Sequence, residues 1–154
     1  MTIEDDIAFL GRVPTLRQLG APALRILAIG AESRAFEAGQ VLFTAGEAAD
    51  GAYVVQRGSF TLKPERPSDS EVVAGPGTLL GETALIAETK RPATATAREA
   101  STVMRISRAM FLKMLEGYPE AAHQMREILA ARSDQWVRDM ENVRAALGPD
   151  GKRG

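Results

Sequence analysis

The residues best suited to chemistry lie between Gly81 and Arg91. Gly81 has no Cβ, so the backbone there is able to approach a ligand closely and to adopt unusual φ/ψ angles. Residues 83–86 are able to start a single helical turn, whose first N–H groups lack internal partners and carry the positive end of the helix dipole. Arg91 adds a two-pronged cationic donor that suits a phosphate. The segment therefore predicts an anion site.

A carboxylate stands beside these donors, at Glu82. It is unsuited to phosphate because like charges repel, but it accepts hydrogen bonds from sugar hydroxyls. Glu82 and Arg91 on either side of a phosphate-sized gap suggest a ligand with both a ribose and a phosphate. The alternative is that the two residues form a surface ion pair worth about 0–1 kcal/mol, and that Gly81 is an ordinary turn glycine.

Composition limits the classes of function. The chain has 154 residues, 45% of them hydrophobic and 25% charged, as expected for one globular domain. A net charge of −1 argues against a broad nucleic-acid-binding face. The absence of cysteine excludes disulfides, thiol catalysis and thiolate metal sites. The acidic N-terminal residues do not resemble a signal peptide, and no apolar run is long enough to cross a membrane, so we expect a cytoplasmic protein.

The pattern of apolar residues predicts helices at both ends of a β region. Residues 3–10 and 22–29 have helical spacing, as do residues 108–116. Between residues 33 and 107, short runs are separated by Gly, Pro and Asp, which is typical of a barrel or sandwich. The predicted strands are residues 40–43, 52–56, 59–63, 71–74, 93–97 and 102–107.

The runs Gly81 to Leu85 and Arg91 to Thr94 are similar to the G-E-x-A-L … R-x-A-T signature of cyclic-nucleotide-binding domains. Residues 49–55 and then Gly58 are similar to the family's A-D-x-x-Y-x-[IV] … G turn and strand. The resemblance covers roughly residues 24–136. It implies a mainly β fold, an eight-stranded antiparallel, jelly-roll-like β-roll over residues 33–107, with N-terminal helices and a long C-terminal helix. We expect one domain over residues 1–147, with helices in 108–147, and a flexible tail at 148–154.

The resemblance also implies roles for single residues. Glu82 would accept from the ribose 2′-hydroxyl, and Arg91 would pair with the cyclic phosphate. Gly81 and Ala84 would offer backbone amides. The remaining candidate contacts of this segment are Thr83, Pro92 and Ala93.

Three positions depart from the family pattern. Leu80 replaces the usual Phe, Ala95 the usual Val, and Pro92 the usual Ala, Ser or Thr. Proline has no N–H, so a phosphate contact through that amide is lost, and the hydroxyl often linked to guanine is missing. The ligand implied is therefore cAMP, with cGMP as the alternative.

Residues 119–147 are predicted to form one long helix. Its apolar residues recur at roughly heptad spacing, and in the family this helix either pairs with its copy in a dimer or closes over the ligand. Trp136 would stack on the purine or anchor a helix interface. Arg132, one turn earlier, would reach Glu82 or the ligand, or else be a solvated charge. The apolar residues are Met125, Leu129, Trp136, Met140, Val143 and Leu147.

These features predict a regulatory module that binds a cyclic nucleotide and couples the Gly81–Arg91 segment to the C-terminal helix. Its partners would be an effector protein and a second copy of the chain. No DNA-binding segment follows Leu147, so no DNA binding is expected. The sequence offers no nucleophile–base set and no cluster of metal-ligating residues. We therefore expect no enzymatic activity and no metal site. The alternative is a β-roll that serves interaction or dimerisation without nucleotide.

Overall fold

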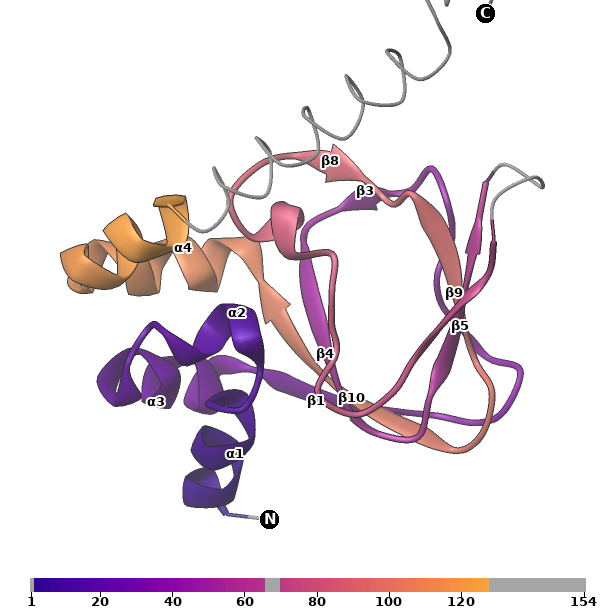
Figure 1. The fold of residues 1–154 in the computed structure, drawn as a ribbon, viewed down its shortest axis with the longest axis horizontal. Coiled ribbons are helices and arrows are strands. Elements are labelled where there is room, and N and C mark those ends of the chain that lie inside the picture. Colours follow the sequence, from indigo (N-terminus) through magenta and orange to yellow (C-terminus); the bar gives the residue numbers. More distant parts are fainter. Residues whose placement is uncertain (1, 66–69, 128–154) are drawn as a thin grey trace, which may run out of the picture.

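The structure is a computed structural model that describes residues 2–65 and 70–127. It consists of two antiparallel sheets with helices at one end (Figure 1). One sheet has the strand order β1-β10-β4-β7, the other has the order β2-β9-β5-β6, and β3 pairs with β8. The strands are β1 Glu32–Phe36, β2 Val41–Phe43, β3 Ala48–Ala49, β4 Gly51–Arg57, β5 Phe60–Pro64, β6 Val72–Ala74, β7 Leu79–Leu80, β8 Thr89–Lys90, β9 Ala93–Ala97 and β10 Ser101–Ser107. The predicted antiparallel fold with flanking helices is confirmed.

Strand count differs from the expectation, because the described residues hold ten strands where the resemblance implied eight. The strands β3, β7 and β8 have two residues each, which is too short for apolar alternation to be recognised. The strand β1 is almost wholly exposed, so it lacks an apolar face, yet it pairs with β10 from Glu32↔Arg105 to Phe36↔Ser101. Backbone pairing defines these strands, and side-chain pattern does not.

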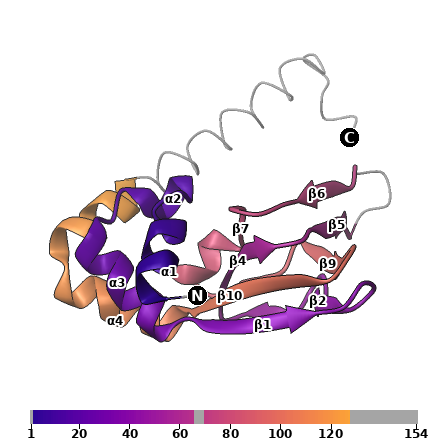
Figure 2. The ribbon, with the colours of Figure 1, turned by 90° about the horizontal axis from the view of Figure 1, so that it is seen from below.

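Helices gather at one end of the sheets (Figure 2). Three of them match predicted ranges, and α2 was not predicted. Residues 119–127 are also helical, while the rest of the expected 119–147 helix and the expected 148–154 tail lie outside the described residues. The helices are α1 Ile3–Leu10, α2 Pro14–Arg17, α3 Ala21–Gly30 and α4 Arg108–Gly117, and a 3₁₀ turn, η1, covers Glu82–Leu85.

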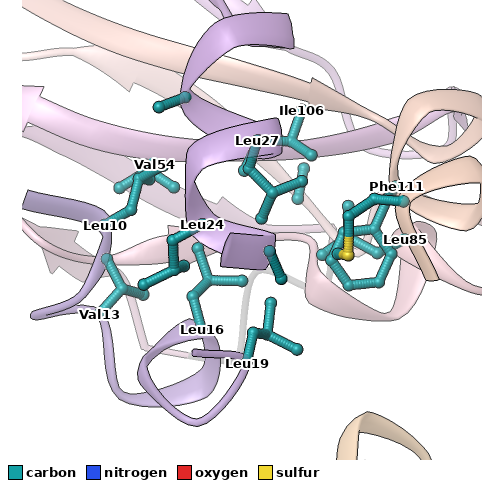
Figure 3. Close-up of a cluster of buried hydrophobic side chains, with 14 of the residues drawn as sticks. Leu10, Val13, Leu16, Leu19, Leu24, Leu27, Val54, Leu85, Ile106 and Phe111 are labelled. Carbon is teal, nitrogen blue, oxygen red and sulfur yellow. The ribbon is translucent and has the colours of Figure 1, made fainter. Parts of the chain in front are cut away.

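The strand β4 separates two buried clusters, and its side chains alternate between them. Val54 faces the helices, whereas Tyr53 and Val55 face the interior between the sheets, as the twofold period of a strand requires. The helical cluster joins α1, α2, α3 and α4 to the outer face of the sheet, and Figure 3 shows Leu85 of η1 lying against Phe111 of α4 inside it. The turn η1 is therefore part of the helical core.

The end of α4 nearest the sheets is fixed by a cap. The hydroxyl of Ser107, at the N-cap, accepts a hydrogen bond of 3.2 Å from the Met110 N–H, and such caps contribute about 0.5–2 kcal/mol. Within residues 2–65 and 70–127, no helix is long and apolar enough to span a bilayer.

Replacing Phe111 with alanine is expected to lower the free energy of unfolding by about 3–5 kcal/mol, the usual cost of removing a buried aromatic ring. Phe111 is fully buried between η1 and the helices. Its neighbour Leu112 is 39% exposed, so Leu112→Ala should change that free energy by only about 0.5 kcal/mol. Urea unfolding of both variants measures the difference. Equal losses would contradict the placement of Phe111.

Candidate functional site

The predicted anion segment folds as a turn between β7 and β8. Gly81 has φ 79° and ψ 38°, the left-handed region, and η1 begins at the next residue. A Cβ at Gly81 would collide with Nη1 of Arg91, the far end of a long side chain, and the left-handed backbone angle is what requires glycine. The turn packs between α4 and β4 (Figure 1). The predicted helical turn at 83–86 exists and begins one residue earlier, at Glu82.

Arg91 is buried beneath this turn, with 4% of its surface exposed. Its Nη2 donates to the Gly51 carbonyl at 2.9 Å. The guanidinium carbon lies 4.4 Å from the centre of the Phe43 ring and 5.4 Å from that of Tyr53, which are distances of cation–π attraction. A surface ion pair is therefore the wrong interpretation of Arg91.

One polar atom of this side chain stands out. Among residues 2–65 and 70–127, no hydrogen-bond partner is found for the buried Nη1 of Arg91. Burial lowers the pKa of the Arg91 guanidinium, and the nearby groups of Tyr53, Asp50 and Glu47 oppose that shift. A buried cation with an unpartnered donor is costly unless an anion meets it. The arrangement fits a phosphate that would accept from Nη1.

Glu82, the predicted ribose acceptor, contacts the N-terminal helices. Its Oε2 accepts a hydrogen bond from the hydroxyl of Thr15 at 3.0 Å. Thr15 lies on α2 and is only 4% exposed, whereas Glu82 is half-buried. A residue that is distant in the sequence and lies on another element therefore contacts the carboxylate.

Arg108, the first residue of α4, holds the turn from another direction. Its Nη1 donates to three backbone carbonyls, those of Ala49 at 2.9 Å, Ala84 at 3.1 Å and Ala87 at 3.0 Å. One guanidinium nitrogen thereby joins β3, η1 and the residues after η1 to the start of α4. Any displacement of the turn must break these bonds or move α4 with it.

The structure gathers most of the predicted site residues in this one segment. Gly81, Glu82, Thr83 and Ala84 form the turn, and Arg91, Pro92 and Ala93 lead into β9. The Ala84 N–H donates to the Gly81 carbonyl at 3.0 Å inside the turn, so it is already used there. Arg132 and Trp136 lie outside the described residues.

Sequence reasoning missed three side chains of this site, Thr15, Phe43 and Arg108. No local pattern could reveal Thr15, since it lies 67 residues from Glu82. Phe43 was expected only as a strand residue. The signal for Arg108 was its position directly after a predicted strand and at the start of a predicted helix, where a long cationic side chain is able to reach back to the sheets. In the described part of the chain, no group of three or more metal-ligating side chains is found.

Comparison with known proteins agrees with this geometry. The family model of the cyclic nucleotide-binding domain matches residues 33–118 of this chain. A solved structure of a cyclic nucleotide-binding-like protein from Brucella abortus is 43% identical, with a TM-score of 0.64, covering 73% of this chain and 98% of that one.

Two curated relatives are longer proteins. An uncharacterized NTE family protein of Mycobacterium tuberculosis is 34% identical over 122 residues, covering 79% of this chain and 21% of the relative. A cAMP-dependent protein kinase regulatory subunit of Yarrowia lipolytica is 32% identical over 107 residues, covering 70% of this chain and 28% of the relative. The match thus spans only 21% and 28% of the length of these two relatives.

Replacing Arg108 with methionine is expected to lower the free energy of unfolding by about 1.5–3 kcal/mol, because hydrogen bonds from a charged donor contribute that much. Methionine keeps much of the aliphatic length and removes the donors to Ala49, Ala84 and Ala87. The exposed Arg98 provides the matched control, and Arg98→Met should be close to neutral. Guanidinium unfolding compares the variants. If Arg108→Met were as stable as the wild type, the three hydrogen bonds of Arg108 would contribute nothing to the free energy of unfolding.

Proposed function

The chain belongs to the cyclic nucleotide-binding domain family, and we propose that it is a regulatory module that binds cAMP and acts through binding, without catalysis. The observation that carries this proposal is the buried Nη1 of Arg91, which has no hydrogen-bond partner in the described residues. A cyclic phosphate would supply the missing acceptor and the missing negative charge together. Glu82, on the same turn, would accept from the ribose.

Two observations support cAMP over cGMP as the ligand. Pro92 has neither an N–H nor a hydroxyl, so a contact that would favour guanine is lacking. One of the relatives is a cAMP-dependent protein kinase regulatory subunit. The proposal also places the protein in the cytoplasm, where a nucleotide made inside the cell would reach it.

The proposed output runs from the turn to the helices. Arg108 bonds the carbonyls of Ala84 and Ala87, and Leu85 is fully buried in the helical cluster. A shift of the turn on binding would therefore be passed to α4 and to the C-terminal residues that follow it. The ligand drives such a shift only through its different affinity for the two arrangements. The receiver would be an effector protein or a second copy of the chain.

Replacing Arg91 with methionine is expected to weaken cAMP binding by on the order of 2–5 kcal/mol, as for removal of one partner from a buried charge pair. Isothermal titration with cAMP, cGMP and 5′-AMP measures the loss on protein first shown to be free of nucleotide. Lys90, adjacent and exposed, gives the matched control, and Lys90→Met should bind nearly as well as the wild type.

Two results would refute the site. One is unchanged cAMP affinity in Arg91→Met, and the other is an equal loss in Lys90→Met. If the wild type bound no nucleotide at all, the β-roll would be an interaction module instead.

Without ligand, the free energy of unfolding of the same Arg91→Met variant is expected to be no more than about 1 kcal/mol below that of the wild type. Replacing a buried charge with an apolar side chain of similar volume is often neutral or stabilising. A structural arginine would behave in the opposite way. Thermal unfolding with and without saturating cAMP separates the two roles. The wild type should gain stability from cAMP and the variant should not. A large loss of stability in the ligand-free variant would argue that Arg91 serves the fold.

A further inference from the structure

The hydrogen bond from Thr15 to Glu82 connects α2 to the segment between Gly81 and Arg91. It has a length of 3.0 Å between Oγ1 of Thr15 and Oε2 of Glu82. Thr15 is held rigidly, because Val13 on one side and Leu16 on the other are at most 1% exposed in the helical cluster. A β-branched side chain also has few χ1 rotamers. The donor is therefore well placed to restrict the orientation of the carboxylate that accepts from it.

The chemistry of a carboxylate allows one donor to orient it for another. An ionised carboxylate has two oxygens and about four acceptor sites, so the Thr15 bond occupies one of them. A hydroxyl bonded to a carboxylate is a strong, charge-assisted contact. Glu82 also begins a turn of only four residues, which by itself places little restriction on a long side chain. The Thr15 hydroxyl adds a restriction from a second element of the fold.

We propose that Thr15 is a positioning residue that orients the Glu82 carboxylate toward the 2′-hydroxyl of a bound ribose. The inference rests on the proposed function and adds to it that discrimination between ribose and deoxyribose depends on the N-terminal helices. Thr15 does not itself touch the nucleotide. Its effect is confined to the part of the binding free energy that comes from the 2′-hydroxyl.

Two ligands and one isosteric substitution isolate this effect. Valine matches threonine in shape and lacks the hydroxyl, so Thr15→Val removes the donor with little change in packing. Titration with cAMP and with 2′-deoxy-cAMP should show that the wild type prefers cAMP. In Thr15→Val the affinity for cAMP should fall roughly 3- to 10-fold, the equivalent of one hydrogen bond. The affinity for 2′-deoxy-cAMP should stay within about twofold, so the ratio of the two affinities falls.

Three further variants complete the test. Thr15→Ser keeps the hydroxyl and should keep the wild-type ratio. Thr15→Ala removes the hydroxyl in a smaller side chain and serves if Thr15→Val does not fold. Glu82→Gln is the reference for loss of the carboxylate, and its ratio should be at least as low as that of Thr15→Val. A merely structural role of Thr15 would lower both affinities together and leave the ratio unchanged.

The outcomes separate this inference from the proposed function. An unchanged ratio in Thr15→Val overturns the positioning role, and a raised ratio overturns it in favour of competition between Thr15 and the ribose for Glu82. If the wild type binds cAMP through Arg91 but does not distinguish the two ligands, the positioning role alone is lost. If the wild type binds no cAMP at all, the proposed function fails and the positioning role fails with it.

Discussion

The desolvated guanidinium of Arg91 lies where β2, β4 and the turn at Gly81 meet, and its burial is the constraint on which the candidate site depends. Arg91 reaches the carbonyl of Gly51 at the start of β4, lies over the ring of Phe43 from β2, and places Nη1 where a Cβ at Gly81 would stand. Gly51 supplies a dipole and Phe43 a π face, and within residues 2–65 and 70–127 no ion pair of Arg91 is found. The fold thus brings a cation into its interior and leaves its neutralisation incomplete.

The turn above this cation is held by the helices as well as by the sheets. Leu85 belongs to the helical core, Arg108 binds its carbonyls from α4, and Thr15 binds Glu82 from α2. The three contacts are of different kinds, apolar, charged and hydroxylic. A movement of the turn would have to break these contacts or carry the helices with it. These contacts are the physical basis of the proposed coupling between the turn and the helical end.

Sequence reasoning predicted the parts of this arrangement that have a local signature. The glycine and the arginine stood out by type and spacing, and β4 and β10 stood out by their apolar runs. The strand β1, whose residues are mostly exposed, and the two-residue strands gave no such signal. The contacts of Thr15 and Arg108 join residues 67 and at least 21 positions apart. Such pairs are set by the tertiary fold, so no window along the chain could contain them.

The glycine at position 81 affects the order in which residues of this site would be replaced during evolution. In a descendant that no longer met an anion, the buried cation would bring only its desolvation penalty, and apolar replacements of Arg91 would be favoured. The space beside Gly81 would then open, but its φ of 79° would still disfavour any side chain. The arginine would therefore be lost before the glycine. A related chain that retains the glycine without the arginine is the expected footprint of a lineage that has abandoned its ligand.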